Sequence, residues 1–280
     1  MKRLFLVFSA EFIFLSSFAQ WTAVGGGTNN FVFSLYTDTV SNLLYLGGDF
    51  ANAGASLVNK AATWNGINYS AMSGGVDATV YCFGRYAGTN IVGGNFTNAG
   101  ASPAQKIVAW TGSSWSPLLA GISNTVYAMA EYNGELWVGG TFSQANGSAS
   151  YYLAKWTGST WVQMGTATDA GVRAMVVWNG ELYVAGSFTN IVGTPANRIA
   201  KFNGSTWSAL GAGTNNTVLT LKVFNNELYA GGQFTQADGN PASYIAKWNG
   251  TAWSQPGAGT SMWVKALTVY NNELVAGGEF

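Results

Sequence analysis

A repeat of 46 residues constrains this chain more than any other feature of its sequence. Its marker is a short motif of two small residues (Gly-Gly or Ala-Gly), a variable residue and Phe, and each of six copies follows the last by 46 residues. The phenylalanines of the motif are Phe50, Phe96, Phe142, Phe188, Phe234 and Phe280. A fixed period of this length indicates an architecture in which one supersecondary unit packs against copies of itself.

Each unit has the pattern of four short strands. In the third copy we expect strands over residues 125–132, 135–142, 151–157 and 160–165. An Asn-Gly pair at 133–134 joins the first two, and Asn-Gly favours two-residue hairpins because both positions need a positive φ. Four antiparallel strands at this period are typical of a β-propeller blade. The predicted fold class is therefore all-β, a propeller of four-stranded antiparallel blades.

Columns of equivalent positions agree with that fold. Early in the first strand every copy has valine: Val32, Val80, Val126, Val172, Val218 and Val264. Two residues later stands a small residue, and Cys82 fills this position in the second copy, where we expect an inert buried thiol. An aromatic column is interpreted as packing between blades, with sugar binding as the alternative: Trp64, Trp110, Trp156, Phe202 and Trp248.

The two ends of the repeat array suggest an incomplete ring. Residues 21–25 have the pattern of a lone fourth strand, and the sequence ends at Phe280, after the second strand of the sixth copy. Propellers often close by letting an N-terminal strand complete the last blade. We therefore expect at least six blades, the last incomplete, in a fragment truncated at its C-terminus.

The repeat resembles known propeller families. The segment ELWVGGTF, followed later by LAKW, resembles the kelch-type repeat. The longer pattern, which continues to I-A-K-W-N-G, is closer to a kelch-like bacterial repeat often labelled a cortical cell-polarity marker domain. The resemblance spans essentially all of residues 21–280 and implies an extracellular, surface-associated bacterial protein. It implies little about activity, because propellers carry many unrelated functions.

The first nineteen residues have the pattern of a secretory signal. A basic start, Met1-Lys2-Arg3, precedes an apolar stretch, and small residues at 17 and 19 fit a cleavage site after Ala19. An uncleaved membrane anchor is the alternative. We predict a signal peptide over 1–19 and a propeller over 20–280, in a protein that is secreted or held at the outer cell surface. With Cys82 as its one cysteine, the chain has no intramolecular disulfide.

Charge and composition exclude several functions. The chain has 12 basic and 12 acidic residues, so nothing in its net charge favours nucleic acid, and no apolar stretch after Ala19 is long enough for membrane insertion. It has no histidine, which removes His-dependent triads and His-ligated metal sites. We expect a monomer with no cofactor, calcium being the one ion considered.

The candidate site lies on the face with the longer connections between strands, because variable loops on a rigid scaffold commonly bind ligands. One polar column lies near the expected channel mouth: Asn29, Asp77, Ser123, Asp169, Asn215 and Ser261. These oxygens suit calcium or a sugar, and the alternative is that they stabilise turns. A second column is the position directly after each valine of the first strand, and two of its residues are charged, Arg173 and Lys265. We predict a ligand site at Asp77, Asp169, Arg173, Trp263 and Lys265, the alternative being a solvated channel with an Asp169–Arg173 ion pair.

Three functions fit this sequence. We favour a non-catalytic binding module that recognises an extracellular glycan or protein through the long-loop face. A structural or adhesive scaffold that presents downstream domains is the second. A glycosidase or lyase that uses Asp77 and Asp169 is the third, and their expected separation by two blades argues against a shared substrate bond.

Overall fold

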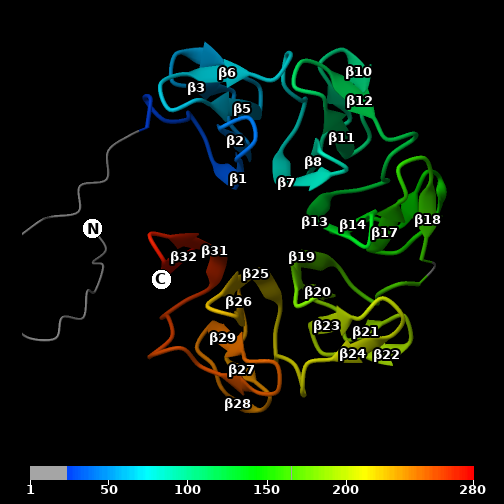
Figure 1. The fold of residues 1–280 in the computed structure, drawn as a ribbon, viewed down its shortest axis with the longest axis vertical. Helices are drawn as coiled ribbons and strands as arrows, with labels where there is room; N and C mark the ends of the chain where they lie inside the picture. Colours follow the sequence, from blue (N-terminus) through cyan, green and yellow to red (C-terminus); the bar gives the residue numbers. More distant parts are fainter. Residues whose placement is uncertain (1–23, 165) are drawn as a thin grey trace, which may run out of the picture.

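The chain forms a ring of radially arranged antiparallel sheets around a central axis (Figure 1). The structure is a computed structural model that describes residues 24–164 and 166–280. Each blade has the strand order first, second, third, fourth from the axis outward, and successive blades contact one another through their innermost strands. The expected all-β propeller with four-stranded antiparallel blades is confirmed.

Blades one to three follow the repeat directly. Blade one has β1 (Val32–Asp38), β2 (Leu43–Gly48), β5 (Ala61–Trp64) and β6 (Tyr69–Ala71). Blade two has β7 (Val80–Tyr86), β8 (Thr89–Gly94), β11 (Ile107–Trp110) and β12 (Trp115–Pro117). Blade three has β13 (Val126–Tyr132), β14 (Glu135–Gly140), β17 (Leu153–Trp156) and β18 (Trp161–Gln163).

Two further blades and one hairpin complete the array. Blade four has β19 (Val172–Trp178), β20 (Glu181–Gly186), β23 (Ile199–Phe202) and β24 (Trp207–Ala209). Blade five has β25 (Val218–Phe224), β26 (Glu227–Gly232), β29 (Ile245–Trp248) and β30 (Trp253–Ser254). The last hairpin has β31 (Val264–Tyr270) and β32 (Glu273–Gly278).

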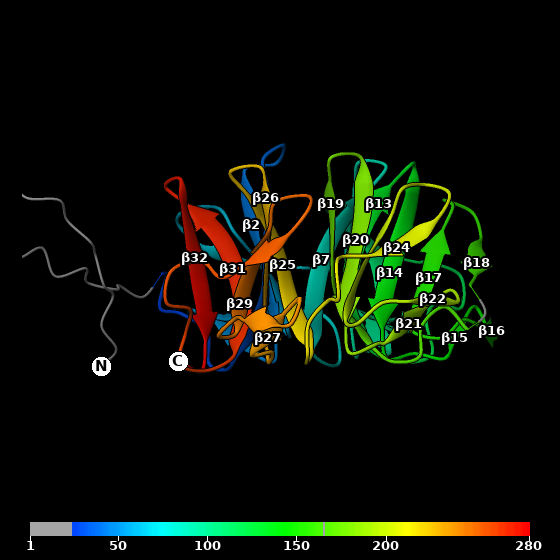
Figure 2. The same ribbon diagram turned by 90° about the horizontal axis from the view of Figure 1, so that it is seen from below.

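A small two-stranded sheet lies between the second and third strands of every blade. These sheets are β3 (Asn52–Ala53) with β4 (Ser56–Leu57), β9 (Asn98–Ala99) with β10 (Ser102–Pro103), β15 (Gln144–Ala145) with β16 (Ser148–Ala149), β21 (Asn190–Ile191) with β22 (Thr194–Pro195), and β27 (Gln236–Ala237) with β28 (Asn240–Pro241). Several of them lie on one face of the ring in Figure 2. The opposite face carries the tight turns, such as Asn133-Gly134, in which both residues have positive φ.

The expected number of blades is wrong. The structure has five four-stranded blades, and β31 and β32 form a two-stranded sheet among the residues described. The error comes from what the repeated motif marks: it ends the second strand, so six motifs specify six inner hairpins. A blade also needs its two outer strands, and five copies supply them.

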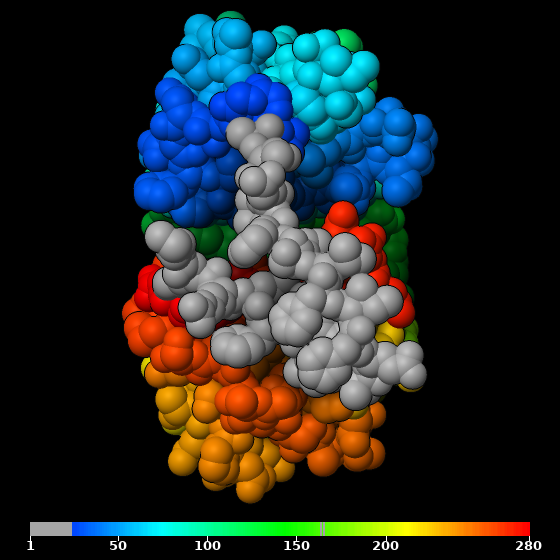
Figure 3. Space-filling view, turned by 90° about the vertical axis from the view of Figure 1, so that its left-hand side faces the viewer, coloured from blue at the N-terminus to red at the C-terminus, as the bar shows by residue number. Residues whose placement is uncertain are grey.

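The strand expected over residues 21–25 is described only at its last two residues. Residues 21–23 lie outside the described residues, but Val24 and Gly25 are seen beside blade one. The Tyr69 hydroxyl of β6 donates a hydrogen bond to the Val24 carbonyl over 2.8 Å. Val24 and Gly25 therefore pack on the outer part of blade one, and neither of these two residues pairs with β31 or β32. Figure 3 shows the side of the ring where blade one and the last hairpin are neighbours.

The inner ring is packed through the glycines of the repeat. A Cβ on Gly139 would overlap Val172 and stand 2.6 Å from Met175 Cε, both on the inner strand of the next blade. A Cβ on Gly140 would overlap the carbonyl oxygen of Thr125, which accepts a hydrogen bond from the Thr141 amide over 3.0 Å. The motif is therefore glycine-rich because two backbones and a neighbouring valine occupy the space of its side chains.

The predicted aromatic column packs between neighbouring blades: Trp110, Trp156 and Trp248 each belong to a core cluster that combines residues of two adjacent blades. The tryptophans of the fourth strands add bonds between blades. The Trp161 indole of blade three donates to the Leu118 carbonyl at the end of blade two over 3.0 Å. Trp253 of blade five makes the same bond to Leu210 over 2.8 Å. The motif phenylalanines Phe50, Phe96, Phe142, Phe188 and Phe234 are fully buried. Cys82 is also buried, and burial raises the pKa of its thiol well above the usual value.

Ion pairs add fixed contacts outside the core. Within blades three to five, a third-strand lysine pairs with the glutamate after the hairpin turn, each at 2.9 Å: Lys155–Glu135, Lys201–Glu181 and Lys247–Glu227. Such partly exposed pairs stabilise by about 1 kcal/mol at most. Between blades one and two, Arg85 lies 2.9 Å from the buried Asp38. Burial opposes ionisation of Asp38, but hydrogen bonds from Asn90, Ser41 and Val40 outweigh it and lower its pKa to about 2.

We expect Gly140→Ala to destabilise the propeller by about 1–3 kcal/mol, the usual cost of overpacking a tight site. The new methyl group meets a backbone carbonyl that is held by its own hydrogen bond, so neither side can yield easily. Gly277→Ala is the control, because no heavy atom lies within 4 Å of its Cβ position and its φ is not positive. Urea unfolding measures both, and equal losses for the two variants would contradict the steric explanation.

Candidate ligand-binding site

A β-bulge in each inner strand directs one side chain toward the axis. In β13, Val126 pairs with Gly140 and Ala128 pairs with Gly139, which leaves Tyr127 as an extra residue between them. A bulge of this kind re-aims the side chain of the extra residue. The same register shift occurs in β1, β7, β19, β25 and β31. The extra residues are Phe33, Tyr81, Tyr127, Arg173, Leu219 and Lys265.

These six side chains line one cavity of about 420 Å³. Its wall is completed by residues from the same end of the inner strands: Ser187, Thr217, Gln233 and Trp263. Because the bulges follow the start of each first strand and face the end of each second strand, the cavity lies at the end of the ring that carries the small hairpins. This is the long-loop face on which we expected a ligand site.

Aromatic rings form one half of the cavity wall. The ring centroids of Phe33 and Tyr81 are 5.3 Å apart, and those of Tyr81 and Tyr127 are 4.9 Å apart, both in tilted arrangements. Phe33 is 51% exposed, so its ring is available to a ligand. Burial, and next the neighbouring Tyr127, raise the pKa of Tyr81, which keeps its hydroxyl protonated as a hydrogen-bond donor.

Positive charge occupies the other half of the wall. The guanidinium carbon of Arg173 lies 4.1 Å from the centre of the Tyr127 ring, a cation–π contact that fixes its plane. The Arg173 Nε atom is buried and has no hydrogen-bond partner within the described part of the chain. Lys265, more than half exposed, forms an ion pair with Glu279. Leu219 and Trp263 supply apolar surface between them.

Of the five predicted site residues, the structure brings three together. Arg173, Trp263 and Lys265 line the cavity. Asp77 and Asp169 do not line it, and the alternative Asp169–Arg173 ion pair is not among those formed by the described residues. Whether the three residues bind a ligand stays a prediction.

Asp77 and Asp169 instead hold the loop that follows the second strand. Asp77 Oδ1 accepts bonds from the amides of Thr97 and Asn98 at 2.7 and 3.1 Å, and its other oxygen accepts from both side chains. Asp169 likewise accepts from the amides of Thr189 and Asn190 and from the Thr189 hydroxyl. Asn29, Ser123 and Asn215 accept two equivalent amides in their own blades. This column therefore anchors loops, which is the turn-stabilising alternative.

The aromatic half was missed as a site, although its residues stood in the same sequence column as Arg173. Only the two charges of that column were selected, because a charge on an inner strand is costly unless it reaches water or a partner. The alternation of side chains along a regular strand does not predict that these rings face the axis, because a bulge sets their direction. The signal available was an unpatterned position between an invariant valine and a small residue.

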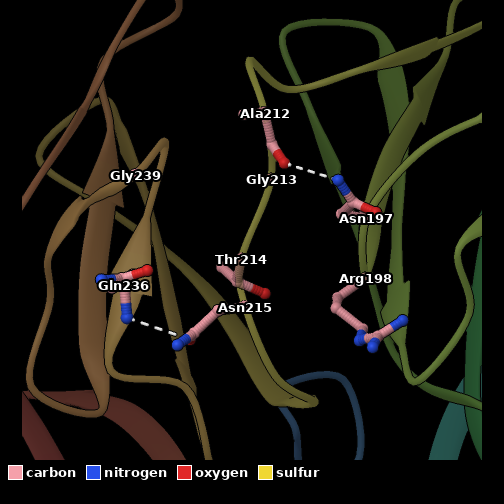
Figure 4. A pocket seen from close by; sticks show the side chains of 8 residues that line it. All are labelled: Asn197, Arg198, Ala212, Gly213, Thr214, Asn215, Gln236 and Gly239. Carbon is pink, nitrogen blue, oxygen red and sulfur yellow. Dashed lines mark hydrogen bonds between the residues drawn. The ribbon is translucent and has the colours of Figure 1, made fainter.

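A second cavity of about 290 Å³ lies on the loops between blades four and five (Figure 4). Its polar groups are already bonded to the protein. Asn197 donates to the Ala212 carbonyl over 3.0 Å, Arg198 donates to the carbonyls of Ser187 and Phe188, and the Asn215 oxygen accepts from the Gln236 amide. We interpret this cavity as part of the loop framework.

Metal and membrane sites were also considered for the residues that the structure describes. Among them we find no group of three or more His, Cys, Asp or Glu side chains that could hold a metal ion. No such group therefore supports the calcium hypothesis. Over the same residues, none of the secondary structure is a helix with the length and apolar character needed to span a bilayer. The predicted signal peptide, 1–19, lies outside the described residues.

Comparison with known families supports the repeat. A family described as a domain of unknown function (DUF5122) beta-propeller matches residues 179–205, which include β20 and β23 of blade four. The chain contains β-propeller repeats. The more specific kelch-like and cell-polarity-marker resemblance is not confirmed by this match. No curated protein matches the sequence.

Solved structures share the fold at low sequence identity. The extracellular domain of BT4673 from B. thetaiotaomicron, described once as a one component and once as a hybrid two component system, is 13% identical with a TM-score of 0.60 in both structures. These matches cover 88% and 92% of this chain but 30% and 31% of BT4673, so this chain spans less than a third of that length. The computationally designed Ika8 protein is 11% identical, with a TM-score of 0.51. The match covers 90% of this chain and 81% of Ika8. At such identities the likeness shows the fold alone.

The loop-anchoring role of Asp77 predicts a specific acid response. Burial opposes its ionisation, but four hydrogen bonds from Thr97 and Asn98 outweigh it and lower its pKa to about 2. An unfolded Asp has a pKa of about 3.9. The folded value is the lower one, so this stabilisation is complete above about pH 5 and is lost progressively as the pH falls toward about 2.

We therefore expect Asp77→Asn to keep near-normal stability at pH 7 and to lose less stability than the wild type between pH 4 and pH 2. Asn215 already makes the equivalent bonds in blade five, with its amide nitrogen donating to Thr235 over 3.0 Å. Urea midpoints measured across that pH range test this expectation. Parallel pH profiles for the two proteins would show that the carboxylate has no such role.

Proposed function

We propose that this chain is a secreted or cell-surface, non-catalytic binding module that recognises an extracellular glycan or protein through its long-loop face. The observation that carries the proposal is the convergence of six bulge residues on one cavity at that face. A scaffold without a ligand needs no such variety at the axis, where Phe, Tyr, Tyr, Arg, Leu and Lys occupy equivalent positions.

The character of the cavity favours a glycan. Ligand sites are concave and mostly apolar, with a few placed polar groups, and this cavity has a volume in their lower range. Aromatic rings pack against the C–H faces of sugars, while the hydroxyls of Tyr81 and Tyr127 and the side chain of Gln233 suit sugar hydroxyls. A folded protein partner would instead make its main contact with the surrounding loops, so binding that ignores the cavity would identify a protein ligand.

The placement of the carboxylates supports a role without catalysis. Glycosidases use two carboxyl groups beside the scissile bond. Asp77 and Asp169 are held by loop amides, and the residues that line the cavity include no Asp or Glu. The glycosidase or lyase alternative therefore lacks a carboxylate pair at the cavity, and binding is the better proposal.

An extracellular location is supported by two independent features. The N-terminal sequence has the pattern of a secretory signal, and BT4673, whose structures share this fold, was solved as an extracellular domain.

We expect Tyr127→Leu to weaken binding of any saccharide held in the cavity by roughly two- to tenfold, in line with the worth of an aromatic contact. Leucine occupies the equivalent position in blade five as Leu219, so the variant is compatible with the fold. Tyr270→Ala is the control, because Tyr270 is an exposed ring beside a turn on the opposite face. Binding to a panel of immobilised polysaccharides measures the effect, and melting temperatures confirm folding. If no saccharide in the panel is retained, or if Tyr127→Leu binds as the wild type does, glycan binding in the cavity is wrong.

A further inference from the structure

The charge of the central cavity goes beyond what a neutral glycan needs. Two of its lining residues, Arg173 and Lys265, are cationic, and none is acidic, although the whole chain has equal numbers of basic and acidic residues. An unpaired cation in a concave, partly apolar site raises the local concentration of anions. Lys265 is partly neutralised by Glu279, whereas Arg173 has no acidic partner among the described residues.

Arg173 is arranged as a binding group and not as a structural ion pair. The other arginines that the structure describes are committed to the protein: Arg85 pairs with Asp38 at 2.9 Å, and Arg198 donates to two backbone carbonyls. Arg173 makes neither kind of contact with the described residues, and its guanidinium carbon lies 4.1 Å from the centre of the Tyr127 ring. Its Nε atom is buried, so the terminal nitrogens are the ones that a ligand can reach. A stacked guanidinium keeps its edge for a planar anion, and a carboxylate matches that edge with two parallel hydrogen bonds.

The geometry joins this cation to the aromatic wall. Tyr127 contacts the guanidinium on one side and Tyr81 on the other, with ring centroids 4.9 Å apart. A ligand whose ring packs on Tyr81 thus presents its substituents toward Arg173. The ligand class that combines an apolar ring face, hydroxyls and a planar anion is a sugar acid.

We propose that the central cavity binds saccharides that carry a carboxylate, of the uronic acid type, with Arg173 binding the carboxylate, Tyr127 supporting Arg173, and Phe33 and Tyr81 packing on the sugar ring. This rests on the proposed function and specifies its ligand class. Lys265 adds charge from the far side of the cavity, where Glu279 already neutralises part of it. Arg173 is therefore expected to dominate.

The experiment compares matched saccharides on the full chain. Three acidic series are tested: oligogalacturonates, oligomers of mannuronate and guluronate, and oligosaccharides that contain glucuronate. Each is compared with its methyl ester and with a neutral oligosaccharide. The ester keeps the ring and the hydroxyls but removes the charge. We expect at least one acidic series to bind, its methyl ester to bind at least tenfold more weakly, and the affinity of the acid to fall as NaCl is raised.

Three variants separate charge, geometry and folding. Arg173→Gln should lose about tenfold or more in affinity for the acidic oligomer while leaving the weak binding of the ester unchanged. Arg173→Lys, which places the residue type of Lys265 at the same bulge, should lose less, because it keeps the charge without the paired donors. Lys222→Gln is the charge-matched control on β25, outside the cavity lining, and should bind normally.

The outcomes distinguish the two proposals. If esters or neutral saccharides bind as well as the acids, or if Arg173→Gln loses acid and ester binding equally, the sugar-acid inference is overturned while glycan binding stands. If no saccharide of either charge binds the folded protein, both proposals fail. Selective loss of acid binding in Arg173→Gln, with a normal melting temperature, supports the inference.

Discussion

The close approach of two backbones at the inner hairpin is the constraint on which the rest of this structure depends. The second glycine of each motif lies against the carbonyl of the residue before the valine, as Gly140 does with Thr125, and any Cβ there would overlap it. That carbonyl accepts the amide that follows the glycine, Thr141 in this blade, over 3.0 Å. The pairing then has to absorb one extra residue, so a bulge follows directly from the tight contact.

The bulge assigns packing between blades and exposure to the central cavity to different residues of the same strand. Its flanking positions pack against neighbours: Val126 is fully buried, and the small Ala128 lies opposite Gly139. The extra residue between them is released from strand pairing and from the core. Each blade can therefore vary one side chain at the axis without disturbing its neighbours, which explains why this position ranges from Phe to Lys while the valine before it never changes.

The sequence was sufficient for the repeat, the four strands and the hairpin turns, because these depend on local patterns that recur every 46 residues. It was insufficient for the blade count, since the motif specifies inner hairpins and says nothing of outer strands. The site was half predicted. Arg173 and Lys265 stood out as charges, but the roles of Asp77 and Asp169 depend on amides about twenty residues later in the chain, and only folding shows that Thr97 and Thr189 reach them.

The asymmetry of the cavity is the strongest argument that the ring does more than fold. Its scaffold is repeated closely enough that loop-anchoring oxygens, motif phenylalanines and Lys–Glu pairs recur blade after blade. Drift from that pattern at a position free of packing constraints would scatter residue types around the axis. Instead, aromatic rings occupy three consecutive blades and are followed at once by Arg173, stacked on the last of them. Contiguous surfaces of different chemistry within a symmetric frame are what recognition of one oriented ligand requires.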